Sequence, residues 1–299
     1  MDDRGLGTIG EIEGWYRGLQ DRLCAALETL DGTSRFIRDR WERPEGGGGD
    51  TGILQGDGPV EKAAVNVSAV WGDTPPGLSE RMAAASDRFF ATGISIIVHP
   101  RNPHAPTFHA NLRHFATDAT SWFGGGLDLT PYYLYPEDAR HFHRVLADVC
   151  GRHDVADHAA WKSACDDYFY LPHRREARGV GGIFFDHLTD HPDEVWAFQR
   201  DLGDHIADAY LPILDRRLAT PFGPAEEEWH LRRRGRYAEF NLVWDRGTRF
   251  GLETGGRTES ILASLPPRTR WDYGVTPDPG TPEAALLEMV AGPPQDWLA

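Results

Sequence analysis

Apolar residues that recur at intervals of three and four residues predict helices, because this spacing places them on one face of the helix. The clearest case is residues 11–30, where the apolar residues are Ile12, Trp15, Tyr16, Leu19, Leu23, Leu27 and Leu30. Further helices are predicted over residues 79–90, 137–150, 193–218 and 281–290. Pro212 is expected to kink the 193–218 helix. Thr281 followed by Pro282 is typical of a helix start.

Apolar and polar residues alternate with a period of two along four other segments. This alternation predicts β-strands whose two sets of residues face opposite sides of a sheet. The segments are residues 63–71, 93–99, 107–115 and 237–245. The sets opposite the apolar ones are Asn66 and Ser68; Ser95, Ile97 and His99; His109, Asn111 and Arg113; and Tyr237, Glu239, Asn241, Val243 and Asp245.

Two interpretations of these polar faces stay open. An antiparallel sheet with one face in water alternates in the same way. A solvated face, however, usually carries Lys, Glu and Thr, whereas these faces carry mainly Ser, His, Asn, Arg and Asp. Such side chains suit a site of hydrogen-bond donors and titratable groups. That second interpretation requires the polar faces of several strands to line one cleft.

The composition narrows the class of function. A formal net charge of -15 disfavours nucleic acid and anionic membrane surfaces as partners. The glycine run at residues 45–49 is expected to be a mobile loop, because no phosphate-binding motif surrounds it. The three cysteines lack the spacing of a disulfide framework, a zinc site or an iron–sulfur cluster. The short apolar runs and the acidic start MDDR predict a cytoplasmic chain without integral membrane association.

Four long blocks resemble one family. They are GISIIVHPRNPHAPTFHANLRHF (93–115), WFGGGLDLTPYY (122–133), DDYFYLPHRREARGVGGIFFDHL (166–188) and GRYAEFNLVWDRGTRFGLETGGRTESILASLPP (235–267). These blocks are similar to the oxygen-dependent coproporphyrinogen III oxidases. The resemblance implies conversion of coproporphyrinogen III to protoporphyrinogen IX in haem biosynthesis, with two propionates oxidatively decarboxylated to vinyls.

The same resemblance implies the architecture. It predicts an α+β fold in which a large, mainly antiparallel sheet is covered by helices on both faces, as a single domain over residues 1–299. It also predicts a homodimer whose interface lies within residues 237–273. The one-sided strands agree with such a sheet.

A carboxylate-binding turn is predicted from the residues themselves. Gly255, Gly256 and Arg257 precede a short helix that must end by Pro266 and Pro267. Backbone amides at a helix start, together with a guanidinium group, suit a propionate carboxylate. The alternative is an ordinary glycine turn before a helix.

Other site residues come from matching positions of the family. His109 matches the proposed proton donor, and Ser95, Asn111 and Arg113 match substrate-binding positions. Asp245 is the candidate that pairs with pyrrole N–H groups or accepts a proton, and the alternative is an acceptor within the turn that follows it.

The resemblance also suggests a divalent metal, held by His99, His109, His143 and His173. The spacing of these residues supports a structural or proton-transfer role better. We expect no cofactor to be required, because the porphyrinogen is itself a reductant, with O2 as co-substrate. The alternatives are a metal-dependent oxygenase of the same substrate and a tetrapyrrole carrier without catalysis.

Overall fold

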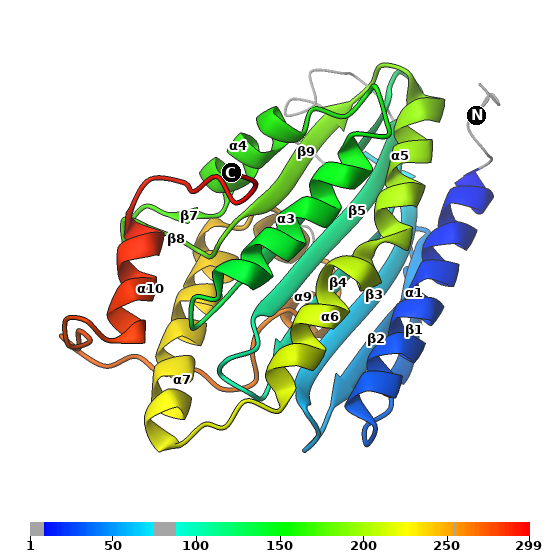
Figure 1. Ribbon diagram of the computed structural model, residues 1–299. Coiled ribbons are helices and arrows are strands. Elements are labelled where there is room, and N and C mark those ends of the chain that lie inside the picture. The colour runs from blue at the N-terminus through cyan, green and yellow to red at the C-terminus, as the bar shows by residue number, and fades with distance from the viewer. Residues whose placement is uncertain (1–8, 75–87, 254) are drawn as a thin grey trace.

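An antiparallel sheet of seven strands runs through the computed structural model, which describes residues 9–74, 88–253 and 255–299 (Figure 1). The strand order is β1-β2-β3-β4-β5-β6-β9. The strands are β1 (Ile37–Glu42), β2 (Gly47–Gln55), β3 (Val60–Asp73), β4 (Arg88–Pro100), β5 (Thr107–Thr117), β6 (Ser121–Thr130) and β9 (Gly182–Leu188). A short ribbon joins β7 (Tyr170–Leu171) to β8 (Glu176–Ala177).

Helices cover both faces of this sheet. They are α1 (Ile9–Asp31), α3 (Pro136–Cys150), α4 (His158–Tyr168), α5 (Pro192–Asp204), α6 (Ile206–Leu218), α7 (Pro224–Glu239), η1 (Phe240–Trp244), α8 (Arg246–Glu253), α9 (Thr258–Leu262) and α10 (Pro282–Ala291). Helices α1, α3, α5 and α6 lie on one face, and α9 lies behind the sheet in Figure 1. This arrangement confirms the predicted α+β class.

The main core fills the space between the sheet and the first group of helices. Ile94, Ile96 and Val98 of β4 are at most 1% exposed and belong to this core. The apolar face of α1 joins them, with Leu19 and Leu27 buried. The period-two and period-three-to-four patterns therefore predicted which sides of these elements are buried.

Three helix predictions and three strand predictions are confirmed. Residues 11–30 lie in α1, 137–150 in α3 and 282–290 in α10. The hydroxyl of Thr281 accepts a hydrogen bond from the backbone N–H of Ala284, as a helix N-cap does. The predicted strands 63–71, 93–99 and 107–115 lie within β3, β4 and β5.

The single helix predicted over 193–218 is wrong, because two helices, α5 and α6, meet at His205. The imidazole Nδ1 of His205 bonds the carbonyl oxygen of Asp201 and closes the end of α5. Helix α6 continues through Pro212, which cannot donate to the carbonyl of Asp208. His141 of α3 bonds that carbonyl instead, at 2.9 Å.

The strand predicted over 237–245 is also wrong. Tyr237 lies in the last turn of α7, and residues 240–244 form the π-helix η1. Tyr237, Phe240 and Asn241 are buried together, at intervals of three and four, whereas Leu242 and Trp244 are exposed. The alternation in the sequence was therefore coincidental, and tertiary burial follows the helical period.

Two further predictions fail at strand ends. The glycine run enters β2 at Gly47, and a Cβ atom on Gly49 would lie 2.4 Å from the ring of Trp41, so these glycines admit close strand packing rather than a mobile loop. Of the helix predicted over 79–90, residues 79–87 lie outside the described residues. Its last three residues, 88–90, begin β4.

Close packing between β6 and β9 gives a stability prediction. A Cβ atom on Gly182 would lie 1.9 Å from the carbonyl oxygen of Leu127, so Gly182→Ala should lower the free energy of unfolding by about 1–3 kcal/mol or more. Gly14 in α1 has open space around its Cα, so Gly14→Ala should raise the free energy by up to ~1 kcal/mol. Urea unfolding of both variants measures the difference, and equal stabilities would contradict this packing.

Candidate active site

The strand register gathers the predicted polar residues on the sheet face opposite the main core. Ser95 of β4 pairs with Asn111 of β5, and Ile97 pairs with His109. His109 in turn pairs with Asp128 of β6. We call this side of β3, β4, β5 and β6 the polar face. The shared face predicted for His109, Asn111 and Arg113 is therefore confirmed.

A chain of three charged or titratable side chains lies at the centre of the polar face. Nδ1 of His109 lies 2.8 Å from Oδ1 of Asp128. Arg178 donates to both oxygens of Asp128, from Nη2 at 2.6 Å and from Nε at 3.1 Å. Asp128 and Arg178 are almost fully buried, whereas the side chain of His109 is 21% exposed. The chain thus runs from the interior to an accessible imidazole.

The environment keeps Asp128 ionised. Burial alone would raise the pKa of its carboxyl group, but the charge of Arg178 and the hydrogen bond from His109 outweigh burial and hold the pKa below its usual value. Burial would likewise lower the pKa of Arg178, and Asp128 outweighs that effect and raises it. Both members of the pair are therefore charged at neutral pH.

Three aromatic rings enclose the guanidinium group of Arg178. Its Cζ lies 4.0 Å from the ring centre of Phe169 and 4.7 Å from the ring centres of Tyr237 and Phe240. Nη1 donates to the side-chain oxygen of Asn241 at 3.3 Å. Cation–π contacts replace part of the lost hydration, so the surroundings fix both the charge and the direction of this side chain.

The carboxylate of Asp128 sets the tautomer of His109. An ionised carboxylate only accepts hydrogen bonds, so the 2.8 Å contact with Asp128 is a hydrogen bond only when Nδ1 carries the proton. In the neutral ring this leaves Nε2 without a proton. Nε2 is thereby the atom of His109 that can take up a proton or, once protonated, deliver one.

A second charged group borders this chain. Arg113 lies 2.8 Å from Asp186 and donates to the side-chain oxygen of Asn111 at 3.0 Å. Arg246 lies 4.0 Å from the other oxygen of Asp186, and its guanidinium group sits 4.7 Å from the ring centre of Tyr168. The side chains of Arg113 and Arg246 are 32% and 63% exposed, so both guanidinium groups are accessible to an anionic ligand.

Asp245 has two partners in the protein. Its Oδ1 accepts from the hydroxyl of Tyr168 at 2.8 Å, and its Oδ2 accepts from the backbone N–H of Thr248 at 2.7 Å. The second contact makes Asp245 the cap of α8, which is the turn role left open from the sequence. Burial, and then the charge of Asp245, raise the pKa of Tyr168 to about 12. Tyr168 packs against Phe169 and Phe240, two of the rings around Arg178, so Asp245 lies near the central chain through Tyr168.

The turn at Gly255 and Gly256 does not present free amides. The N–H of Gly256 donates to the carbonyl oxygen of Gly251 at 2.8 Å, and the N–H of Gly255 to that of Leu252 at 3.4 Å. Arg257 forms an ion pair with Asp39 on the edge strand β1. Asp39 lies four strand spacings from His109, which is roughly 19 Å. Of the three predicted residues, only Arg257 therefore has a group that could bind a carboxylate. This group lies far from His109.

The segment from α9 to Leu265 covers the strands that lie between Arg257 and His109. Nε2 of His99 bonds the carbonyl oxygen of Ser264 at 2.9 Å, and Lys62 donates to the carbonyl oxygen of Leu265 at 2.9 Å. Asn66 donates to the carbonyl oxygen of Ser260 at 3.1 Å. One part of the polar face is thus covered by the protein itself, while His109 and Arg113 stay partly exposed.

The chain matches the model of a known protein family. A model described as coproporphyrinogen III oxidase matches residues 11–297 of the 299. The chain belongs to the coproporphyrinogen III oxidase family. Its general role is therefore that of an oxidoreductase in porphyrin biosynthesis.

The four histidines suggested as metal ligands in this oxidase family do not converge in the structure. His99 is fully buried, and its two ring nitrogens bond Thr107 and Ser264. His143 of α3 bonds the carbonyl oxygen of Val180, and burial lowers its pKa to about 4. His173 bonds Glu239 and Trp244.

Across residues 9–74, 88–253 and 255–299, no three His, Cys, Asp or Glu side chains gather closely enough to hold a metal ion. Each of the four histidines also has a hydrogen-bond partner of its own. These residues therefore do not fit a shared metal site in this structure.

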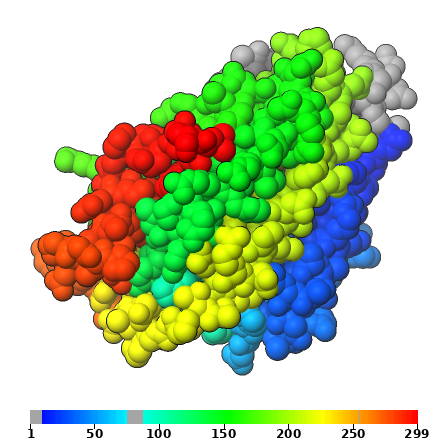
Figure 2. Space-filling model, viewed as in Figure 1, coloured from blue at the N-terminus to red at the C-terminus, as the bar shows by residue number. Residues whose placement is uncertain are grey.

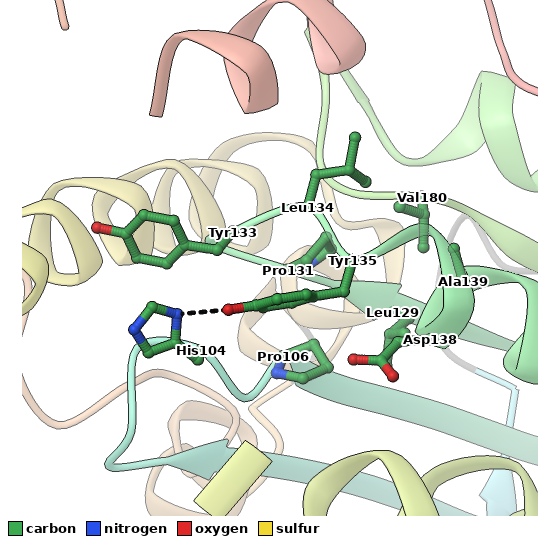
Figure 3. A pocket seen from close by; sticks show the side chains of 10 residues that line it. All are labelled: His104, Pro106, Leu129, Pro131, Tyr133, Leu134, Tyr135, Asp138, Ala139 and Val180. Atoms are coloured by element: carbon green, nitrogen blue, oxygen red, sulfur yellow. Dashed lines mark hydrogen bonds between the residues drawn. The ribbon is translucent and has the colours of Figure 1, made fainter. Parts of the chain in front are cut away.

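A small pocket lies away from this chemistry. His104, Leu129, Tyr135 and Val180 are among its lining residues, and Nδ1 of His104 bonds the hydroxyl of Tyr135 (Figure 3). Its volume is about 10 Å³, enough for about one water molecule. A tetrapyrrole cannot enter this pocket.

Sequence reasoning missed the two most buried members of the site, Asp128 and Arg178. The alternation in the block 122–133 could have shown Asp128, because Gly124, Gly126 and Asp128 fall on one side of β6. Arg178 gives no such signal, because it lies in a turn between β8 and β9.

Among the described residues, every helix is too short or too polar to cross a bilayer.

The buried pair predicts a large stability effect. Asp128→Asn should lower the free energy of unfolding by about 3–5 kcal/mol at neutral pH, because it leaves the charge of Arg178 buried without its partner. Since the folded-state pKa of Asp128 is lowered, its contribution is present above the unfolded pKa of about 4 and is lost as the pH falls through the folded value. Urea unfolding at several pH values measures this difference.

The control for this prediction is Asp204→Asn. Asp204 pairs with Arg22 at 2.6 Å, and both side chains are 53% exposed, so its loss should cost less than about 1 kcal/mol. If the two variants lost equal stability, the account of a buried pair that depends on both charges would be wrong.

Proposed function

We propose that this chain catalyses the oxygen-dependent oxidative decarboxylation of coproporphyrinogen III to protoporphyrinogen IX. The observation that carries this proposal is the chain from Arg178 through Asp128 to the accessible imidazole of His109, beside the guanidinium groups of Arg113 and Arg246. This arrangement combines a proton-transfer group with partners for carboxylates. Family membership supports the substrate.

The reaction sets clear demands on the protein. Each of two propionates loses CO2 and a hydride equivalent, so that a vinyl group remains and oxygen accepts the two electrons. The electron-rich porphyrinogen is the reductant. The protein must therefore bind carboxylates, hold the macrocycle in one orientation and move protons.

His109 meets the need for proton transfer. Its side chain is partly exposed, and Asp128 holds the ring through Nδ1, which leaves Nε2 for proton transfer. Nε2 is placed to accept a proton from the substrate and to pass it to reduced oxygen. Asp128 orients the ring and is too deeply buried to contact the substrate.

The arginines meet the need for carboxylate binding. Guanidinium groups form paired hydrogen bonds to carboxylates, and Arg113 keeps N–H donors beyond those that it uses for Asn111 and Asp186. Ser95 and Asn111 add polar groups beside it. Arg257, near the far edge of the sheet, is our candidate for a propionate on the opposite side of the macrocycle.

Asp245 is assigned a supporting role in this proposal. Each of its two oxygens already accepts one hydrogen bond. A further hydrogen bond from the substrate would use the lone pairs that remain on these oxygens. A pyrrole N–H that bonds Asp245 would also approach the ring of Tyr168. The Asp245 carboxylate would stabilise positive charge on the ring as it is oxidised.

We propose that O2 is the co-substrate and that no cofactor is required, since the substrate supplies the electrons. A metal-dependent oxygenase of the same substrate is the first alternative. A tetrapyrrole carrier without catalysis is the second. The cytoplasmic location expected from the sequence stays a prediction.

One assay distinguishes these functions. Chelator-treated protein is incubated with coproporphyrinogen III, with and without dissolved oxygen, and the products are oxidised and read by fluorescence. We expect protoporphyrin only when oxygen is present. Product that also requires an added divalent metal would favour the metal oxygenase, and tight binding without product would favour the carrier.

We further propose that the protein acts as a homodimer. Leu242, Val243 and Trp244 of η1 are exposed, and so are Trp271 and Tyr273 later in the chain. Runs of large exposed apolar side chains commonly mark a protein interface. They fall within residues 237–273, the range expected for the dimer interface. Their second-copy partner would also shield η1, which holds Phe240 and Asn241 against Arg178.

The dimer proposal predicts the effect of one charge. Leu242→Glu should weaken self-association at least about tenfold, because it places a charge in an apolar contact. Phe222→Glu, at an equally exposed apolar residue before α7, is the control and should leave association unchanged. Sedimentation equilibrium measures both. A monomeric wild-type protein, or a Leu242→Glu variant that associates as the wild type does, would refute the proposal.

A further inference from the structure

The C-terminal tail reaches the segment that carries the buried arginine of the site. After α10 the chain turns back and ends beside α4 (Figure 1). Figure 2 shows these last residues packed against the surface of the segments that precede them in the chain. Trp297 is 9% exposed and belongs to the main core. The tail is therefore packed into the protein at Trp297.

Two ring N–H groups converge on one backbone carbonyl at this place. Nε1 of Trp297 donates to the carbonyl oxygen of Val180 at 3.2 Å. Nε2 of His143 bonds the same oxygen at 3.0 Å. Since a carbonyl only accepts, both ring nitrogens are donors here. Both lone pairs of this oxygen are thus bonded by side chains from the C-terminal tail and from α3.

Val180 lies two residues after Arg178, in a turn that is rich in glycine. Gly179 packs so closely on β6 that a Cβ atom would lie 2.2 Å from the carbonyl oxygen of Leu129. Gly181 has a φ of 77°, which favours glycine. Glycines on both sides leave this backbone with much intrinsic freedom, so contacts with the rest of the protein must fix it.

The Val180 backbone also connects the turn to the strand of Asp128. The N–H of Val180 donates to the carbonyl oxygen of Leu129 at 3.0 Å, and the N–H of Leu129 donates to that of Gly181 at 3.1 Å. Leu129 follows Asp128 directly. The side chains of Val180 and Leu129 both line the small pocket in Figure 3. A shift of Val180 would therefore move Arg178 relative to Asp128.

We propose that Trp297 is a positioning residue for the active site, which acts by holding the carbonyl of Val180 and thereby the turn that presents Arg178 to Asp128. The expected effect of Trp297 on kcat rests on the proposed function. The expected effect of Trp297 on the backbone at Val180 does not. Trp297 lies away from the polar face and does not touch the reacting atoms.

The test variant is Trp297→Phe, which keeps an aromatic ring in the core and removes the N–H donor. The matched control is Trp229→Phe. Nε1 of Trp229 donates to the carbonyl oxygen of Tyr132 at 2.7 Å, and Trp229 is 7% exposed. The control therefore removes the same kind of hydrogen bond from a similarly buried tryptophan, whose N–H bonds Tyr132 and not the turn at residues 178–181.

The first measurement is amide hydrogen exchange of the full-length protein over residues 176–182. In Trp297→Phe, exchange of the Val180 amide should be at least about fivefold faster than in the wild type, since one hydrogen bond that holds this turn is lost. In Trp229→Phe it should match the wild type. Equal exchange in both variants would overturn the proposal.

The second measurement is steady-state turnover of coproporphyrinogen III. Trp297→Phe should lower kcat about tenfold with KM within about twofold of wild type, because a misplaced Arg178–Asp128 pair affects catalysis more than binding. Combining Trp297→Phe with Arg178→Lys should give no further loss beyond Arg178→Lys alone, since the tail acts through Arg178. Additive losses, or an unchanged kcat in Trp297→Phe, would overturn the proposal.

The two measurements separate this proposal from the proposed function. If the wild-type protein did not turn over coproporphyrinogen III, the proposed function would fail. The exchange experiment would then still decide whether Trp297 holds the Arg178 turn.

Discussion

The ion pair between Arg178 and Asp128 is the interaction on which the rest of the site depends. Both side chains are removed from water, and neither charge is tolerable there without the other. Their contact joins β6 to the turn before β9, and the rings of Phe169, Tyr237 and Phe240 close around the guanidinium group. The pair therefore links three parts of the chain that are far apart in sequence.

The same pair explains features that otherwise look unrelated. The π-helix η1 brings Phe240 and Asn241 to Arg178, and short π-helical segments are often found at functional sites. The absence of a side chain at Gly179, next to Val180, allows the backbone of the turn to pack closely against β6. On the other side, the carboxylate of Asp128 holds the imidazole of His109 through Nδ1 and leaves Nε2 for proton transfer. Burying the charges of Arg178 and Asp128 costs free energy. In return, the pair fixes which nitrogen of the partly exposed His109 ring exchanges protons.

Sequence patterns predicted the frame better than the site. Period-two alternation found β3, β4 and β5 with the correct faces, and it brought His109, Asn111 and Arg113 together. It failed at 237–245, because Tyr237, Phe240 and Asn241 are buried on a helical period by contacts with Arg178. Arg178 itself carries no local signal: its burial comes from tertiary contacts alone. The amides of Gly255 and Gly256 likewise looked available, and their internal partners appear only in the fold.

The central claim is that Asp128 fixes His109 with the proton on Nδ1. Nη2 of Arg178 also lies 3.4 Å from Nδ1, and a hydrogen bond donated there would require the opposite tautomer. The contact of Nδ1 with Asp128, at 2.8 Å, is the shorter one. The most direct test is 15N NMR of the histidine rings, with the His109 signals assigned by their loss in His109→Gln. We predict that the neutral form of the ring carries its proton at Nδ1 and not at Nε2, and a neutral form protonated only at Nε2 would contradict the account.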